Sequence, residues 1–287
     1  MGPSHYLGKP VDLFAGYRAR IIFNGVRKRR SMLGRYHGIR VSLMLRLLCL
    51  LISSFLVSFP VHAADNVDLA IVLVTDVSRS IDDAEYKLEK DGYSAAFTNP
   101  AVINAIQGGP SGTIAVAYVE FASSFEVRTV LDWTTIHDKE SAQTFVNHLV
   151  AAPRSFWGRT AISAGIDRAV QLLAESGLNP TRRMIDVCGD GTNNAGRDVT
   201  EARDDALKAG ITINGLAIIN DHPMSWTFAH VQPPGGLPNY YRTNVTGGAG
   251  SFVLEVHDFH SFGDAMTRKL VTEIAGRAVP SRFATLP

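Results

Sequence analysis

The most constraining feature of the chain is an unbroken run of apolar residues, 69–74, that stops at Thr75 and Asp76. Apolar residues without polar alternation are typical of a strand buried on both faces, as in the centre of a parallel sheet. Three oxygen-bearing side chains then follow at alternate positions: Asp76, Ser78 and Ser80. Open α/β sheets bind their ligands at the carboxyl ends of their strands. We therefore expect these three side chains to lie at a ligand site.

The rest of the chain alternates between strand patterns and helix patterns. Further strands are predicted at 113–121, 125–133, 183–188, 211–219 and 252–256, and helices at 81–97, 101–107, 138–150, 160–176, 198–208 and 259–274. This alternation predicts one α/β domain, 65–276, with a doubly wound, mostly parallel six-stranded sheet, helices on both faces and one antiparallel edge strand, 125–133. The Pro-, Gly- and Asn-rich stretch 220–250 is predicted to be a long exposed loop.

The amino-terminal segment 1–63 has the pattern of an export signal. Residues 1–64 hold ten of the 28 Lys and Arg residues but one of the 27 acidic residues. Arg46 precedes an apolar core, 47–59, and then Val61-His62-Ala63, which fits a signal peptide cleaved after Ala63. An uncleaved membrane anchor is the alternative, but it needs about 20 apolar residues. We expect an exported protein, periplasmic or extracellular, without membrane contact after cleavage. Met32 and Met44 are more ordinary starts than Met1.

The charge of the predicted domain limits its partners. Subtracting the residues of 1–64 from the totals leaves 18 basic and 26 acidic residues, a net charge of −8. Nucleic-acid binding needs a basic face, so nucleic acid is not an expected partner. Cys49 lies in the predicted signal, which leaves Cys188 without a disulfide partner in the mature chain. Cys188 is expected to be a small buried apolar residue. Residues 277–287 are predicted to be a short tail.

Two predicted buried strands end in acids, Asp76 and Asp190. In a doubly wound sheet these strands lie side by side where the strand order reverses. Thr160, at the start of a predicted helix, can reach the same crevice. The candidate metal ligands are therefore Asp76, Ser78, Ser80, Thr160 and Asp190. A set of oxygens without sulfur or imidazole favours Mg²⁺ or Mn²⁺. Ser80 is also a candidate N-cap of the helix that follows it.

The chain contains three motifs in this order: Asp76-x-Ser78-x-Ser80, Gly158-Arg159-Thr160 and Gly189-Asp190-Gly191. Taken together, they resemble the metal-ion-dependent adhesion site (MIDAS) of the von Willebrand factor type A (VWFA) family, which includes integrin I domains and anthrax toxin receptors. The resemblance covers about residues 66–276 and is closest to an exported bacterial branch described only as a domain of unknown function. It implies that the two serines and the threonine bind the metal directly and that both aspartates act largely through water. It also implies that a Glu or Asp of a partner protein fills the open metal position.

Four further positions lie in or beside these motifs. Arg159, Asn193 and Asn194 border the crevice and are candidate partner contacts. Gly189 departs from the family pattern, because many relatives have Thr there. This change removes one hydroxyl beside Asp190.

Three functions remain open at the level of sequence. The first is a non-enzymatic, metal-dependent protein-binding module. The second is a Mg²⁺-dependent phosphoryl-transfer enzyme, but enzymes of the haloacid dehalogenase type need a second carboxylate two residues after the first, where this chain has Ser78. No Walker A motif is present either. The third is a metal-free structural protein, in which the motif around Ser78 is a bare helix cap and Asp190-Gly191 a plain turn.

Overall fold

The computed structural model of the chain describes residues 65–219 and 233–276. The predicted signal segment and the predicted tail lie outside these residues. None of the helices in the described part of the chain is long and apolar enough to span a bilayer.

In the described residues, six strands form one sheet in the order β3-β2-β1-β4-β5-β6. The strands are β1 (Asn66–Asp76), β2 (Ile114–Phe121), β3 (Val127–Ile136), β4 (Asn179–Gly189), β5 (Thr212–Ile218) and β6 (Val253–Val256). β3 pairs with β2 in antiparallel fashion, and the other neighbours are parallel. The predicted doubly wound sheet with one antiparallel edge strand is confirmed. The strand order reverses between β1 and β4, so the carboxyl ends of these strands form the switch point.

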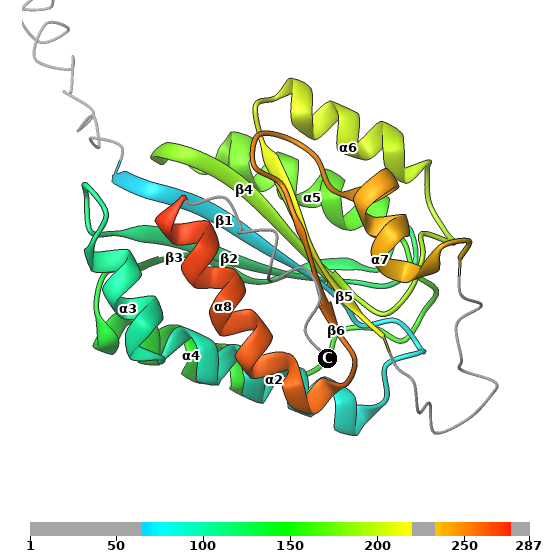
Figure 1. Ribbon diagram of the computed structural model, residues 1–287, viewed down its shortest axis with the longest axis horizontal. Helices are drawn as coiled ribbons and strands as arrows, with labels where there is room; N and C mark the ends of the chain where they lie inside the picture. Colours follow the sequence, from blue (N-terminus) through cyan, green and yellow to red (C-terminus); the bar gives the residue numbers. More distant parts are fainter. Residues whose placement is uncertain (1–64, 220–232, 277–287) are drawn as a thin grey trace, which may run out of the picture. The chain divides into compact units, whose positions relative to one another are not determined.

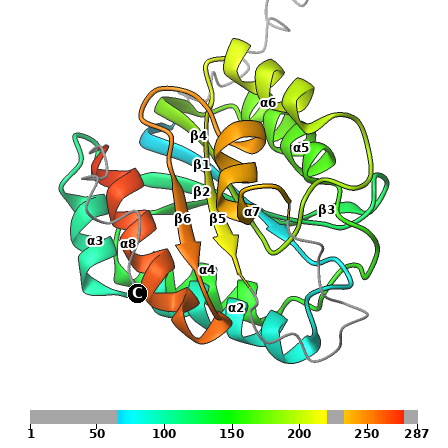
Figure 2. The same ribbon diagram turned by 45° about the vertical axis from the view of Figure 1, so that its right-hand side comes forward.

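Helices cover both faces of this sheet, as Figures 1 and 2 show. One layer contains α2 (Asp83–Phe97), α3 (Pro100–Gln107), α4 (Lys139–Ala151) and α8 (Phe262–Ala275); the other contains α5 (Ile162–Glu175), α6 (Val199–Lys208) and α7 (Gly236–Tyr240). β1 alternates between the two cores: Leu69 and Leu73 belong to the first, and Ala70 and Val74 to the second. Packing on both faces explains why the apolar run in β1 is unbroken.

β3 and β4 differ from their predicted bounds by more than one residue, and β3 runs on to Ile136. β4 begins at Asn179, four residues before the predicted start, and its first five residues are partly or fully exposed. Only the second half of β4 is buried, so its first residues lack the continuous apolar pattern that predicts a central strand. β3 begins at Val127 rather than at residue 125, and Phe125 lies in the turn before it, fully exposed.

The starts of two helices determine which side chains are available at the switch point. Asp82, and not Ser80, is the N-cap of α2: its carboxylate accepts from the backbone N–H groups of Ala84 and Glu85. The predicted capping role of Ser80 is therefore wrong. α5 begins at Ile162, so Thr160 lies before the helix and not in its first turn. Gly165 lets α5 lie close to the sheet, since a Cβ atom there would be 2.6 Å from Val74 Cγ1.

The stretch predicted as one long loop, 220–250, contains helical structure. Residues 220–232 lie outside the described residues, but α7 is followed directly by a π-helical turn, η1 (Tyr241–Val245). Tyr241 and Val245 of this turn are buried in the core next to α5 and α6. The loop prediction is wrong for 236–245, because Pro and Gly masked a short segment that is stabilised by packing. A 3-10 turn, η2 (Phe259–Ser261), leads into α8.

Candidate metal-binding site

Four side-chain oxygens from three segments form a continuous cluster at the switch point. Thr160 Oγ1 lies 3.1 Å from Ser78 Oγ, which lies 3.2 Å from Ser80 Oγ. Ser80 Oγ donates to Asp190 Oδ1 at 2.8 Å. Asp76, the fifth predicted ligand, joins the cluster through its backbone neighbour, because its Oδ1 accepts from the N–H of Ser78 at 2.8 Å. The structure thus brings the five predicted metal ligands together at the ends of β1 and β4.

The cluster lies just below the surface. Asp76 is 0% exposed, Thr160 1%, Ser78 2% and Asp190 5%. Ser80 is half-buried, and the neighbouring side chains of Arg79 and Arg159 are exposed. An ion or a ligand would therefore approach from the side of Ser80, while the other oxygens hold it from below.

Arg154 holds the loop that carries the two serines. Its Nη2 donates to the carbonyl oxygens of Val77, Ser78 and Ile81 at 2.9, 2.8 and 2.8 Å. The guanidinium group also lies over the ring of Trp157, 5.3 Å from its centroid. Guanidinium groups bind backbone carbonyls in a fixed planar geometry, so this contact sets the shape of the loop. Arg154 lies in a loop without a recognisable motif, so the sequence gives no signal for this role.

A second set of contacts holds the segment of Thr160. Asn194 Oδ1 accepts from the N–H of Thr160 at 3.0 Å, and Asn194 N donates to the carbonyl of Thr160 at 2.8 Å. Asn193 Oδ1 accepts from Ser163 N at the start of α5, a helix without a capping side chain of its own. The side-chain oxygens of both asparagines therefore support the site from within. Arg159, whose Nε donates to Asn194 Oδ1 at 3.4 Å, is exposed beside them.

The layer beneath the cluster is buried and contains ionisable groups. Cys188 is a free, buried cysteine whose Sγ donates to Glu89 Oε1 at 3.2 Å. Burial raises the pKa of Glu89 well above its usual value, and the nearby charge of Asp76 raises it further. Burial likewise raises the pKa of Cys188. Both shifts favour the neutral forms of the two groups, and Cys188 is a buried residue, as predicted.

The donor set fits a hard divalent cation. Mg²⁺ demands octahedral oxygen ligands at 2.0–2.1 Å, which places adjacent ligand oxygens about 2.9 Å apart. The three oxygen–oxygen separations in the cluster are 3.1, 3.2 and 2.8 Å. No group of three or more His, Cys, Asp or Glu side chains able to hold a metal occurs in residues 65–219 and 233–276. A cation at the switch point would therefore depend on the hydroxyl groups.

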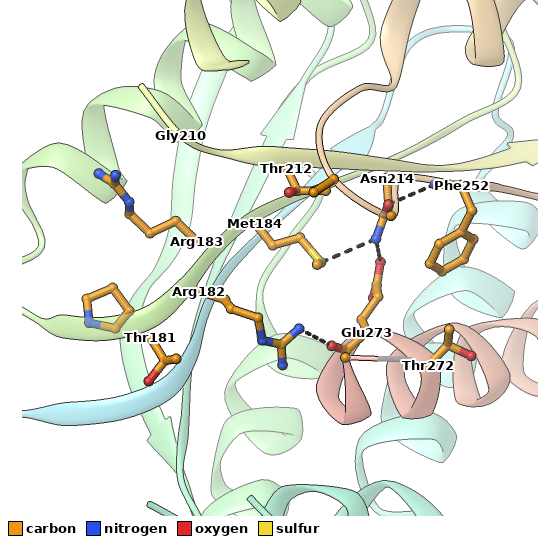
Figure 3. A pocket seen from close by; sticks show the side chains of 14 residues that line it. Thr181, Arg182, Arg183, Met184, Gly210, Thr212, Asn214, Phe252, Thr272 and Glu273 are labelled. Atoms are coloured by element: carbon orange, nitrogen blue, oxygen red, sulfur yellow. Dashed lines mark hydrogen bonds between the residues drawn. The ribbon is translucent and has the colours of Figure 1, made fainter. Parts of the chain in front are cut away.

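A cavity of about 400 Å³ lies at the opposite end of the sheet. It is formed by the first residues of β4 and β5 and the end of α8, and none of the predicted site residues lines it. Figure 3 shows Asn214 in its lining, where Nδ2 donates to Glu273 Oε1 at 2.8 Å and Oδ1 accepts from Phe252 N at 3.0 Å. Arg182 donates to the carbonyl of Glu273. These contacts tie α8 to the sheet, away from the oxygen cluster.

The strand order, the two helical layers and the single antiparallel edge strand are those of the VWFA fold. Solved structures of two proteins illustrate this similarity. Proximal thread matrix protein 1 (PTMP1) from the mussel byssus has a TM-score of 0.54 and 19% identity, covering 74% of this chain and 49% of that one. PTMP1 with a zinc-occupied MIDAS motif has a TM-score of 0.52 and 20% identity, with the same coverage. A von Willebrand factor type A protein from Catenulispora acidiphila has a TM-score of 0.51 and 13% identity, covering 74% and 43%.

These likenesses concern the fold, and the chain spans less than half the length of each of these relatives. The search of curated proteins found no match. The chain belongs to the family described as "Protein of unknown function (DUF1194)", whose family model matches residues 66–278.

Proposed function

We propose that this chain is an exported, non-enzymatic protein-binding module. A divalent cation, Mg²⁺ or Mn²⁺, would be held at the candidate metal-binding site and would take a Glu or Asp carboxylate from a partner protein. The observation that carries the proposal is the pair of separations between the three hydroxyl oxygens, 3.1 Å for Thr160–Ser78 and 3.2 Å for Ser78–Ser80, which are close to the edges of an octahedral coordination shell. The zinc-occupied MIDAS motif of PTMP1, a protein of the same fold, supports it.

Each residue has a distinct part in this proposal. Ser78, Ser80 and Thr160 would contribute neutral hydroxyl ligands, and Asp76 and Asp190 would hold coordinated water. When bound, the cation supplies a positive charge that neutral ligands compensate only weakly, so it attracts an anionic oxygen from outside the chain. The exposed guanidinium of Arg159 lies beside the same opening and favours an acidic partner.

The surroundings of the site support a protein partner. The described residues expose three large hydrophobic side chains, Phe125, Val150 and Trp157. Two of them, Phe125 and Trp157, lie on loops that contact the site: Trp157 precedes Gly158, whose carbonyl accepts from Arg79 N at 3.0 Å. The turn of Phe125 packs on the same loop through Ser123 Oγ, which accepts from Arg159 N at 2.8 Å. Aromatic residues are enriched at protein–protein interfaces, so Phe125 and Trp157 are candidate contacts of a partner.

Export rests on the signal pattern of residues 1–63, and catalysis is not expected. A general acid two residues after Asp76 would be needed for haloacid dehalogenase chemistry, and that position holds Ser78. Mature protein should therefore show no turnover of generic phosphate esters. Turnover that is abolished in Asp76→Asn would replace the binding proposal with an enzyme.

The metal is tested by titrating the purified protein with MgCl₂ and with MnCl₂ in a calorimeter. The wild type should give saturable heat, and the double variant Ser78→Ala/Ser80→Ala should give none. Ser94→Ala/Ser111→Ala, which removes two serine hydroxyls outside the site, is the matched control and should behave as wild type. Equal heats in the wild type and in Ser78→Ala/Ser80→Ala would exclude metal binding by these serines and would favour the alternative of a metal-free structural protein.

The partner is tested by pull-down from envelope extract with Mg²⁺ or with EDTA. A partner should be captured only by the wild-type chain and only in the presence of Mg²⁺. Excess acetate should displace it, because a free carboxylate competes for the open metal position. Phe125→Ala/Trp157→Ala should weaken capture while the Mg²⁺ heat stays unchanged. Capture that is insensitive to EDTA and to Ser78→Ala/Ser80→Ala would show that partner binding does not use the metal.

A further inference from the structure

Tyr241 lies against the candidate metal-binding site from a segment that the sequence motifs do not include. Its side chain is 0% exposed, and it comes from the π-helical turn η1, 51 residues after Asp190 in the chain. A Cβ atom built on Gly189 would lie 3.0 Å from the Tyr241 hydroxyl oxygen and 3.1 Å from Asp76 Oδ2. The hydroxyl thus stands where the side chain of residue 189 would begin, next to the carboxylate of Asp76.

Two glycines on neighbouring strands make room for the tyrosine ring. A Cβ atom on Gly215 of β5 would lie 2.8 Å from Tyr241 Cδ1, and one on Gly189 of β4 would meet the hydroxyl. Neither glycine has a positive φ, so the backbone conformation does not require glycine at either position. The missing side chains therefore create a slot in the sheet surface, and Tyr241 fills it. The next residue along the chain toward the amino end, Tyr240, also contacts the site, because its hydroxyl oxygen accepts from Asn193 N at 3.2 Å.

The hydroxyl of Tyr241 is buried and has no hydrogen-bond partner among the described residues. Buried hydroxyl groups normally find a partner, because leaving one unsatisfied costs free energy. Burial raises the pKa of Tyr241 well above its usual value, and the charge of Asp76 raises it further. The group is therefore a protonated donor at neutral pH.

We propose that Tyr241 is a positioning residue of the candidate metal-binding site and that its hydroxyl donates a hydrogen bond to the Asp76 carboxylate when a divalent cation is bound. The tyrosine would supply, from a distant segment, the hydroxyl that Gly189 lacks. Groups that hydrogen-bond a carboxylate near a metal fix its orientation, and their loss typically lowers metal affinity about 10- to 100-fold. This inference rests on the proposed metal-binding function.

The test uses Tyr241→Phe, which keeps the ring and removes only the hydroxyl. Its dissociation constant for Mg²⁺, measured by calorimetry, should rise about tenfold or more. Its melting midpoint in EDTA should stay equal to that of the wild type or rise, because no hydrogen bond is lost in the metal-free protein. Addition of MgCl₂ should also change the tyrosine near-ultraviolet absorbance of the wild type, and this change should be smaller in Tyr241→Phe.

Tyr118→Phe is the matched control, since Tyr118 is a buried tyrosine of β2 whose ring packs edge-on against Tyr93. This variant should bind Mg²⁺ as the wild type does. An unchanged Mg²⁺ affinity in Tyr241→Phe, with heat in the wild type, overturns the role of Tyr241 and leaves the metal site standing. A lower melting midpoint in EDTA would show instead that the hydroxyl is structural. Absence of Mg²⁺ heat in the wild type removes the metal site and the inference together.

Discussion

Replacing Arg154 by Ala should destabilise the domain and weaken metal binding at once. The side chain is 5% exposed, and one of its nitrogens, Nη2, donates to three carbonyl oxygens in the loop of Val77, Ser78 and Ile81. A hydrogen bond with a charged partner contributes about 1.5–3 kcal/mol to stability. A nitrogen with two hydrogens makes about two such bonds at full strength, which sets the loss at roughly 3–6 kcal/mol.

Water that enters the vacated space will donate hydrogen bonds to some of the freed carbonyl oxygens of the loop. The expected loss is therefore the lower end of this range, about 3 kcal/mol. For a domain of this size, 1 kcal/mol corresponds to a shift in melting temperature of about 2–4 °C. The Arg154→Ala variant should therefore melt roughly 6–12 °C below the wild type in EDTA. Its Mg²⁺ affinity should fall at least about tenfold, because Ser78 and Ser80 lose the fixed geometry of their loop.

The assay is thermal denaturation in EDTA followed by calorimetric titration with MgCl₂ below the melting range. Arg168→Ala is the control, since Arg168 of α5 donates to the hydroxyl of Thr129 at 2.9 Å and lies outside the site. It should change stability by about 1 kcal/mol or less and leave the Mg²⁺ affinity unchanged. Arg154→Lys should recover only part of the loss, because an ammonium group lacks the planar fork. If Arg154→Ala melts at the same temperature as the wild type, Arg154 does not stabilise the loop of Ser78 and Ser80.

Three further predictions concern buried groups. Lys269→Met should lower the free energy of unfolding at pH 7 by about 3–5 kcal/mol, because it leaves the buried carboxylates of Asp186 and Glu273 without their cation. Urea titrations measure this loss, and a variant as stable as the wild type would contradict the prediction. Burial, and then the charge of Asp186, raises the pKa of Glu273 to about 7. The folded protein then binds more protons than the unfolded chain between about pH 4.5 and 7, so stability should fall as pH rises through this range and level off above it. Denaturation at several pH values should show that the free energy of unfolding falls less steeply with pH in Glu273→Gln than in the wild type. Equal slopes would show that Glu273 does not cause the pH dependence. Gly189→Ala should destabilise the domain by about 1–3 kcal/mol, since its Cβ would lie 2.8 Å from the Cβ of Asp76; an unchanged melting temperature would exclude this close contact.

Much of the fold was readable from the sequence, because the signals involved are local. The apolar run of β1 predicts a strand buried on both faces, and its abrupt end at Asp76 locates the carboxyl edge of the sheet. Ligands of doubly wound sheets bind where the strand order reverses, at the carboxyl ends of two neighbouring strands. This rule predicts from the sequence that Asp190 lies beside Asp76. The alternate spacing of Asp76, Ser78 and Ser80 describes a turn, in which a carboxylate accepts from the backbone two residues later. Such contacts depend on neighbours in the chain, so the sequence contains them.

Only the tertiary structure decided which distant residues support the site. Arg154 reaches the serine loop from the connection between α4 and α5, and Tyr241 comes from a segment whose composition predicts a loop. The side-chain oxygens of Asn193 and Asn194 accept the backbone N–H groups of Ser163 and Thr160, a supporting role that the sequence does not indicate. None of these roles follows a periodic pattern, because each depends on how close one packed element comes to another. Local periodicity determines the strands and the motif; the packing distances between elements determine what holds them in place.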